Sequence, residues 1–227
     1  MLLSRRHQQL DPLFLQDSKI EQVSSYKYLG VMITSNLKWD NHINIVSLKA
    51  RRLLGYLYRV FYRNVEPKYL LNLYISLVRP HLEYACQIWD PYTQISIDQL
   101  EKVQKYALRI CTGQWNAGYD DLLDQFNLPR LSNRREFLRL VTFFQIHTNH
   151  FYFPPHVLSH QLRAMSTTST SNRRQVPAHA YTIPFARTTT FKQSFFPRTI
   201  SVWNYLPELV IDNNICYFKT ILRNFLL

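Results

Sequence analysis

Basic residues recur at helical spacing between positions 41 and 65, a stretch without Asp or Glu. Steps of three and four residues bring side chains to the same side of an α-helix. Cations gathered there can follow the phosphates of a nucleic-acid backbone. A merely solvated helix surface usually mixes both signs of charge, so the lack of acids favours phosphate binding over that alternative. The predicted nucleic-acid-binding residues of this stretch are Lys49, Arg52, Arg59 and Arg63, with Tyr56 among them.

A second group of basic residues lies near position 135, where Arg134, Arg135 and Arg139 are interrupted only by Glu136. We predict that these three arginines also bind nucleic acid, for the same electrostatic reason. Several further side chains could stack on bases or contact phosphates, namely Tyr58, Tyr62, Arg173, Arg174, Phe195, Phe196 and Trp203. For the last three, which have the spacing of a packed corner, we favour a place in the core.

The histidines of the sequence could suggest a metal site, but their surroundings argue against one. His147 and His150 are three residues apart and can share a helix face, whereas His156 and His160 follow Pro154. No cysteine or carboxylate stands beside them to complete a ligand set. The sequence also contains no glycine-rich phosphate loop and no nucleophile elbow. We therefore predict no metal site, no cofactor and no catalytic residue.

The composition predicts a basic intracellular protein. Lys and Arg number 27 against 15 Asp and Glu, which gives a formal net charge of +12. That excess suggests a polyanionic partner, nucleic acid before an acidic membrane surface. The 3 cysteines are too few for a disulfide framework, and no apolar run has the length of a membrane span. We expect reduced cysteines, no membrane and a nuclear or cytoplasmic location.

The hydrophobic pattern predicts which elements position these residues. PLFLQ and KIEQV read as short strands around a turn at Asp17-Ser18, and YKYLGVMIT, residues 26–34, reads as a third strand with Gly30 in its middle. Helical periods then cover about 40–63, 66–89 with a break at Pro80, 95–111 and 132–147, with a short helix in GYDDLLDQFNLP and a terminal one in CYFKTILRNFLL. The predicted fold class is mainly α with a small N-terminal antiparallel β element (α+β).

The same pattern predicts the buried side chains. One face of the helix at 40–63 is apolar, and so is one face of the helix at 132–147. The predicted core residues are Ile43, Val46, Ala50, Leu53, Leu54, Leu57, Phe61, Phe137, Leu140, Val141 and Phe144. The segment VRPHLEYACQIW is predicted to be scaffold, with Tyr84 and Trp89 filling the helical core.

An ordered series of segments resembles the C-terminal part of LINE-type (non-LTR) retrotransposon reverse transcriptases. The segments are YKYLGVMIT, the basic helix, VRPHLEYACQIWDPYT, LEKVQKYALRICTG, RREFLRLVTFFQIHTN and PFARTTTFKQSFFPRTISVWNYLP. The likeness runs from about Pro12 to Leu227, and its specificity comes from the order of the six blocks rather than from any one of them.

The resemblance implies a helical bundle like a polymerase thumb followed by a helical C-terminal region. Residues 1–38 would be a palm remnant, 39–113 the thumb-like domain, 114–160 the C-terminal region, 161–190 a polar linker and 191–227 an aromatic corner with a terminal helix. It also implies that Tyr28, Leu29 and Gly30 correspond to the primer grip, where a glycine permits close backbone approach. The alternative for Gly30 is a bulge or a tight packing contact.

The family's catalytic carboxylates lie upstream of the K-Y-L-G-V strand, so we expect neither block here. Tyr119-Asp120-Asp121 looks like the polymerase aspartate pair, but it lacks the intervening residue and opens a predicted helix. We predict that its carboxylates instead favour the helix dipole and cap the first N–H groups of that helix. The resemblance thus implies a truncated fragment that is not an enzyme on its own, with Mg²⁺ expected only in the full-length parent. Its implied partners are an RNA or DNA template–primer and the missing catalytic palm. The alternative is a helical structural or interaction protein, or a non-functional transposon remnant.

Overall fold

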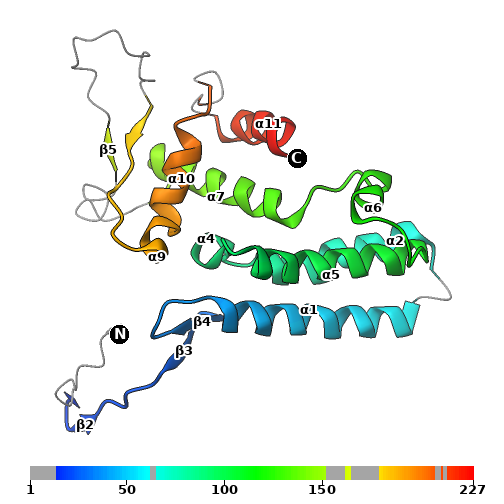
Figure 1. The fold of residues 1–227 in the computed structure, drawn as a ribbon, viewed down its shortest axis with the longest axis horizontal. Coiled ribbons are helices and arrows are strands. Elements are labelled where there is room, and N and C mark those ends of the chain that lie inside the picture. The colour runs from blue at the N-terminus through cyan, green and yellow to red at the C-terminus, as the bar shows by residue number, and fades with distance from the viewer. Residues whose placement is uncertain (1–13, 62–64, 152–161, 165–178, 208–210, 212–213) are drawn as a thin grey trace.

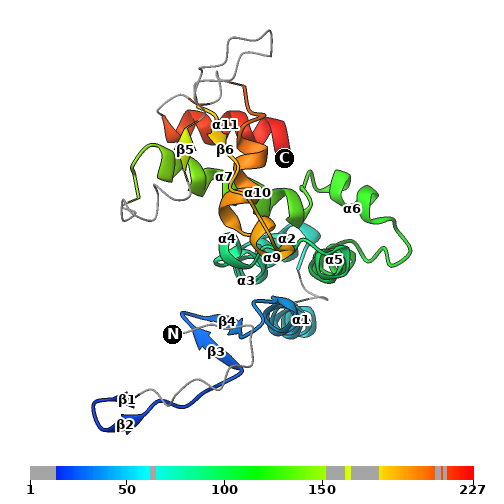
Figure 2. The same ribbon diagram turned by 60° about the vertical axis from the view of Figure 1, so that its left-hand side comes forward.

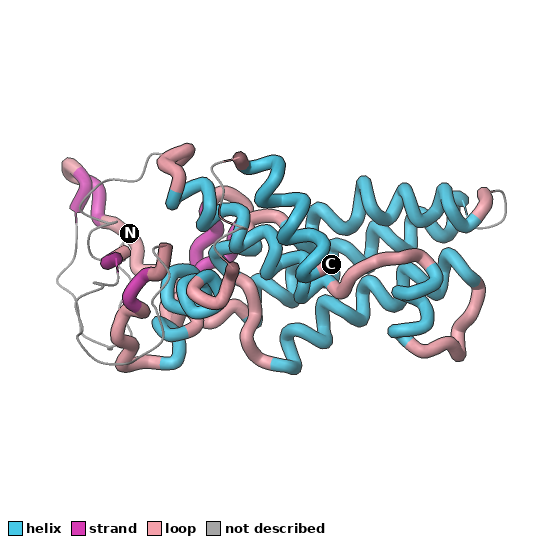
Figure 3. Tube along the Cα trace, turned by 90° about the horizontal axis from the view of Figure 1, so that it is seen from above, coloured by secondary structure: helices cyan, strands magenta, loops and turns pink. Residues whose placement is uncertain are grey.

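The computed structural model describes residues 14–61, 65–151, 162–164, 179–207, 211 and 214–227. Helices form most of this part of the chain, and the short strands gather at one end of the molecule (Figure 3). The predicted α+β class with a predominance of helix is confirmed.

Short connections join most helices up to α7, whereas β5 and β6 lie in the sequence between α7 and α9. The helices are α1 (Asp40–Phe61), α2 (Pro67–Leu73), the π-helix η1 (Tyr74–Val78), α3 (Arg79–Glu83), α4 (Cys86–Trp89), α5 (Gln94–Thr112), α6 (Tyr119–Gln125), α7 (Leu131–His147), α9 (Thr189–Lys192), α10 (Phe195–Trp203) and α11 (Ile215–Leu226). The strands form antiparallel pairs, namely β1 (Phe14–Leu15) with β2 (Ser18–Lys19), β3 (Ser25–Tyr28) with β4 (Val31–Thr34), and β5 (Arg163–Ala164) with β6 (Tyr181–Thr182).

The helices stack in successive layers, which run from bottom to top in Figures 1 and 2. α1 is the outermost layer, α2, α3 and α5 pack against one side of it, α7 packs on α4 and α5, and α11 packs on α7. A hydrophobic core between α1 and the second layer includes Leu82, Trp89 and Leu100, all fully buried. Because α1 is the outermost layer, no described helix packs against its opposite side.

The two main helical faces predicted from the sequence are confirmed. Ile43, Ala50, Leu54 and Leu57 are buried, and Val46, Leu53 and Phe61 pack against them as partly buried side chains. All four predicted core residues of α7 are buried as well. Gly113 ends α5 in the left-handed conformation with φ of 70°, as expected of a helix C-terminus.

The polypeptide around Pro80 accommodates a proline within a helical segment. Pro80 has no N–H, and the preceding turn widens into the π-helix η1. Ala85 then adopts a left-handed φ of 52° and separates α3 from α4. Trp89 is buried and its Nε1 donates to the Tyr84 carbonyl at 2.8 Å. The Tyr84 ring itself is 58% exposed, so the prediction that it fills the core was wrong.

The stretch YKYLGVMIT is a hairpin and not a single strand, which corrects the prediction. Tyr28 pairs with Val31, and Leu29 and Gly30 form the two-residue turn with φ of 45° and 86°. Positive φ at both positions is the type I′ geometry that matches the twist of antiparallel strands. Gly30 is therefore required by a turn, and a Cβ built on it would lie 3.4 Å from Cε1 of Tyr84. The first hairpin likewise turns at Gln16-Asp17, one residue earlier than predicted.

Leu29 is an unfavourable residue for its place in the turn, and this gives a first test of the hairpin. A leucine in the left-handed region costs about 1 kcal/mol, whereas asparagine visits that region readily. We expect Leu29→Asn to raise the free energy of unfolding by about 0.5–1 kcal/mol in urea titrations. Gly30→Ala should lower it by a similar amount. Equal stability of wild type and both variants would contradict the assigned turn.

The C-terminal part of the chain packs around aromatic side chains. Phe143 and Phe144 of α7, Trp203 of α10 and Phe218 of α11 are fully buried together. Phe195 and Phe196 pack at the edge of this core, so the predicted packed corner and terminal helix are confirmed. Within the predicted linker, β6 pairs with β5 and Ala180 is buried, while the Ser/Thr-rich residues 165–174 lie outside the described chain. The division into domains stays a prediction.

Candidate nucleic-acid interface

The side of α1 that faces away from α5 is a continuous exposed surface, which we call the outer face of α1. Asp40 in the first turn of α1 and Arg59 in its last turn both interact favourably with the helix dipole. Helical spacing places one set of exposed side chains together on this side. The outer face consists of Ile45, Leu48, Lys49, Arg52, Tyr56, Arg59 and Val60.

The predicted cations of α1 are exposed on the outer face. Within the described residues, no ion pair involves Lys49, Arg52 or Arg59, and the Arg59 Nε donates only to the Gly55 carbonyl at 3.3 Å. Tyr56 is 55% exposed among them. Arg63 and Tyr62 lie outside the described residues. The outer face thus presents positive charge that no carboxylate of the described part of the chain neutralises.

The positive potential at the outer face reaches its neighbour α3. Burial lowers the pKa of His81, and the charge of Lys49 lowers that pKa further, so the imidazole is neutral at pH 7. Arg51 is also exposed, although the sequence analysis did not select it. Its helical position places it towards α5 rather than on the outer face.

The predicted primer-grip residues lie at the tip of the β3–β4 hairpin. This tip is exposed, and hydrogen bonds to α1 and to the end of α3 hold the hairpin in place. Tyr28 and Leu29 are 57% and 73% exposed. The Tyr84 hydroxyl donates to the Leu29 carbonyl at 3.0 Å and so fixes the turn against the end of α3. At the base of the hairpin the Met32 N–H donates to Nδ1 of His42 in α1 at 3.2 Å. These anchors join residues far apart in sequence, and no local pattern indicated them.

His42 links the hairpin to the core. Its ring meets that of Trp89 edge-on, with centroids 5.0 Å apart. Burial lowers the pKa of His42, which keeps the ring neutral and leaves Nδ1 able to accept from Met32. These contacts hold the hairpin at the N-terminal end of α1. The hairpin tip and the outer face are therefore parts of the same packed unit.

The second predicted cluster is not available to nucleic acid, which corrects the prediction for Arg135 and Arg139. Their side chains are 0% and 3% exposed, and both bond to the carboxylate of Asp90. Arg134 is partly buried, and its Nη2 donates to Oε2 of Glu83 at 2.9 Å. That hydrogen bond raises the pKa of Arg134 and holds it as an internal cation. The apolar residues on nearly all sides of α7 could have signalled burial.

Asp90 collects a third arginine that the sequence analysis missed. Arg198 of α10 approaches Asp90 Oδ2 at 3.2 Å and also donates to the Asp90 and Pro91 carbonyls. Burial lowers the pKa of Arg139, and the neighbouring Arg198 lowers it further. One buried carboxylate thus joins α4, α7 and α10 in a structural ion-pair cluster.

The Tyr119-Asp120-Asp121 sequence begins a helix, as predicted from its context, but the prediction that its carboxylates cap that helix was wrong. It begins α6, and Asp120 pairs with Arg130 at the surface. The Tyr119 hydroxyl donates to Glu101, and burial together with Glu101 raises its pKa. No side chain caps the first N–H groups of α6, so the carboxylates act on the helix dipole without capping bonds.

Glu101 has a second role at the start of α7. Its two carboxylate oxygens accept hydrogen bonds from the backbone N–H groups of Leu131 and Ser132 at 3.2 and 2.8 Å.

The described residues contain no group of three or more His, Cys, Asp or Glu side chains that could hold a metal ion. His147 bonds Tyr181 through Nδ1 at 2.7 Å, and His156 and His160 lie outside the described residues.

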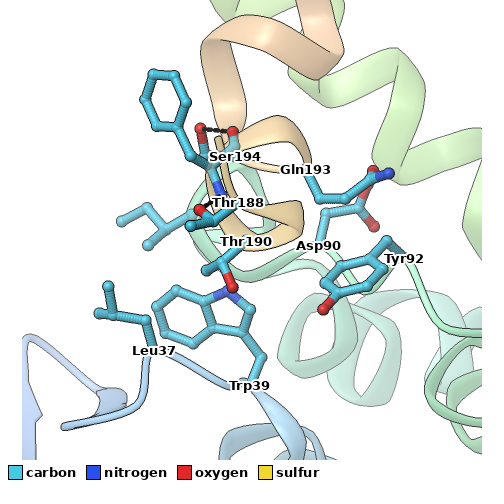
Figure 4. A pocket seen from close by; sticks show the side chains of 10 residues that line it. Leu37, Trp39, Asp90, Tyr92, Thr188, Thr190, Gln193 and Ser194 are labelled. Carbon is cyan, nitrogen blue, oxygen red and sulfur yellow. Dashed lines mark hydrogen bonds between the residues drawn. The ribbon is translucent and has the colours of Figure 1, made fainter. Parts of the chain in front are cut away.

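A pocket of about 380 Å³ opens beside the start of α1 (Figure 4). The β4–α1 connection contributes Trp39, the α4–α5 connection contributes Tyr92, and α9 with its flanks contributes Thr190 and Gln193. Figure 4 shows the two rings on one side of the pocket and the α9 residues on the other. No pattern in the sequence indicated this site, because its walls come from three separate parts of the chain.

Comparison with known proteins relates part of the chain to a retrotransposon. Over 107 residues it is 23% identical to a probable RNA-directed DNA polymerase from transposon X-element of Drosophila melanogaster, covering 46% of this chain and 12% of that protein. Over 134 residues it is 31% identical to an uncharacterized protein of Caenorhabditis elegans, covering 56% of this chain and 65% of that protein. The chain thus spans less than two thirds of either relative. No protein-family model and no solved structure matches it.

The partial similarity to the X-element polymerase indicates a retrotransposon-related protein as the class of this chain. Among the described helices, none combines the length and apolar character needed to cross a membrane.

Proposed function

We propose that the chain is a fragment of a LINE-type reverse transcriptase that binds a nucleic-acid template–primer without catalysing synthesis on its own. The binding surface is the outer face of α1 together with the tip of the β3–β4 hairpin. The observation that carries this proposal is the exposure of Lys49, Arg52 and Arg59 on one uncovered side of a helix, without partner carboxylates among the described residues. The partial likeness to a transposon polymerase supports the same context.

The roles within this surface follow from chemistry. Guanidinium and ammonium groups along the helix contact successive phosphates and bind without regard to base sequence. Tyr28 and Leu29 on the hairpin supply apolar contact area where Gly30 lets the backbone turn tightly. The catalytic carboxylates and their paired Mg²⁺ ions belong in this proposal to the palm of the parent enzyme, and the fragment positions the duplex for them.

Salt dependence tests the outer face directly. The affinity for a labelled RNA–DNA hybrid is measured by fluorescence anisotropy at salt concentrations from about 50 to 200 mM. The variant K49A/R52A/R59A should bind more weakly than wild type, and each lost phosphate contact should reduce the salt slope by about 0.9 unit. We expect the slope of log K against log salt to flatten by about two to three units, equally for unrelated sequences.

The control is K102A/R130A/R223A, which removes the same charge from exposed positions outside α1. It should leave the slope within about half a unit of wild type. Equal slopes for the two triple variants would remove the proposal, because binding would then follow net charge alone.

A protein partner is the second candidate for the outer face. Ile45, Leu48 and Val60 are exposed there by 43%, 53% and 46%. Apolar groups between cations suit a surface that another chain covers, such as the missing palm. Light scattering separates the two functions: self-association abolished by Leu48→Ser and Val60→Ser, with nucleic-acid affinity unchanged, would favour the interaction protein.

A further inference from the structure

We infer that the pocket beside the start of α1 receives one unpaired base of a single-stranded nucleic acid. This rests on the proposed function only in taking a polynucleotide as the partner. It adds a site for a base to a surface that otherwise contacts phosphates.

The walls of the pocket suit a flat aromatic ring. Trp39, Tyr92 and Phe191 line it from three different segments, and Leu37 and Ile88 add apolar area. Its volume of about 380 Å³ lies in the range of pockets that hold small ligands. Any base can stack on an aromatic side chain, whatever the nucleic-acid sequence, because every base has a π-face. Trp39 and Tyr92 lie on the same side of the opening (Figure 4).

The opposite wall is polar and comes from α9 and its flanks. Thr188, Thr190, Gln193 and Ser194 line this side. Hydroxyl and amide groups both donate and accept, so they match the mixed hydrogen-bonding edge of a base. The Thr188 hydroxyl accepts from the Phe191 N–H at 3.3 Å and the Ser194 hydroxyl donates to the Phe191 carbonyl at 2.7 Å, so the Gln193 amide is the lining group that we expect to bond the edge of the base.

The charge around the pocket favours a ligand that carries phosphate. Asp90 is the acidic residue in the lining, and its carboxylate is already shared by Arg135, Arg139 and Arg198. Exposed cations flank the lining residues in sequence. They are Lys38 between Leu37 and Trp39, Arg187 before Thr188, and Lys192 between Phe191 and Gln193. A base in the pocket would therefore have cations near its own phosphates.

The pocket is also within reach of the outer face. Trp39 immediately precedes Asp40, the first residue of α1, so the pocket opens at the N-terminal end of that helix. Lys49, the first cation of the outer face, follows Asp40 by nine residues, which is about 13 Å along the helix axis. The geometry thus separates phosphate contacts on α1 from one base contact at its start.

The test compares two single strands of ten nucleotides by fluorescence anisotropy, one of deoxyadenosines and one abasic with the same charge. Wild-type protein should prefer the base-bearing strand, and Tyr92→Ala should reduce that preference by about fivefold or more, since stacking on one ring accounts for at least this factor. Binding of the abasic strand should not change. An unaltered preference in Tyr92→Ala, or an equal loss for both strands, would overturn the inference.

Tyr205→Ala is the matched control, because Tyr205 is 88% exposed and lies at the far end of α10 from the pocket. It should leave the preference intact. In a Trp115→Phe background the two remaining tryptophans besides Trp39 are fully buried, so Trp39 dominates any quenching by ligand. The base-bearing strand should quench this emission and the abasic strand should not. Displacement of the strand by an aromatic dipeptide, but not by AMP, would identify a protein occupant and overturn the inference.

The two proposals fail separately. K49A/R52A/R59A should weaken both strands alike and keep the quenching at saturation. Unchanged salt slopes with base-dependent quenching would remove the outer face and leave the pocket. A flattened slope without base-dependent quenching would do the reverse.

Discussion

Replacing Asp90 with Asn should lower the free energy of unfolding by about 3–5 kcal/mol, because it leaves three guanidinium groups without their shared carboxylate. The side chains of Arg135, Arg139 and Asp90 are 0%, 3% and 7% exposed, so water cannot take the place of the lost charge. The Asn amide would also turn a donor towards arginines that only donate. Such a loss is a large part of the stability of an ordinary domain, and urea unfolding would measure it.

Asp120→Asn is the control for this prediction. Asp120 pairs with Arg130 at the surface, where the two side chains are 72% and 45% exposed. Removing that pair should change the free energy of unfolding by less than about 1 kcal/mol. Exchanging Arg135 for Met in the Asp90→Asn background should restore part of the loss, because it removes one uncompensated charge. Equal effects of Asp90→Asn and Asp120→Asn would contradict the buried cluster.

Trp203→Ala should cost about 3–5 kcal/mol, the range of large cavities in cores. The Trp203 ring lies 4.8 Å from that of Phe143 and 6.0 Å from that of Phe218, centroid to centroid, and so joins α7, α10 and α11. Its Nε1 donates to the His179 carbonyl at 3.1 Å, and this hydrogen bond links the segment just before β6 to the same core. Thermal or urea unfolding should show the loss, together with faster hydrogen exchange in α11.

Trp203→Phe and Phe225→Ala bracket this effect. The first keeps an aromatic ring and should cost about half as much as Trp203→Ala. The second removes a ring that is 68% exposed and should change the free energy of unfolding by about 0.5 kcal/mol or less. If Trp203→Ala were as stable as the wild type, α11 would not depend on this core.

Local chemistry was sufficient to predict most helices. The apolar period placed α1 and α7 within about two residues, and Gly113 marked the end of α5. The same reasoning misplaced the hairpin. Apolar residues on both sides of Gly30 suggested one strand. In the hairpin β3 is exposed throughout and β4 is buried or partly buried against α1, so neither strand shows the alternation of a half-buried sheet.

Contacts across the chain were beyond local reasoning. Tyr84 was placed in the core from its apolar neighbourhood, yet its hydroxyl reaches the Leu29 carbonyl, 55 positions earlier in the sequence. The pocket likewise needs Trp39, Tyr92 and α9, which come together only when the C-terminal part of the chain packs on α4. Neither feature has a spacing that a sequence pattern would reveal.

The sequence by itself determined the bounds of the long helices α1, α5 and α7, the excess of positive charge, and the cationic side of α1, because periodicity and helix-end signals act within a few residues. Only the tertiary structure decided which arginines meet solvent. Arg52 and Arg135 are the same residue type on two long helices, but α1 is packed on one side, whereas α7 lies between α4 and α5 below and α10 and α11 above. An arginine on a helix enclosed in this way must find a carboxylate within the protein, and Asp90 provides it.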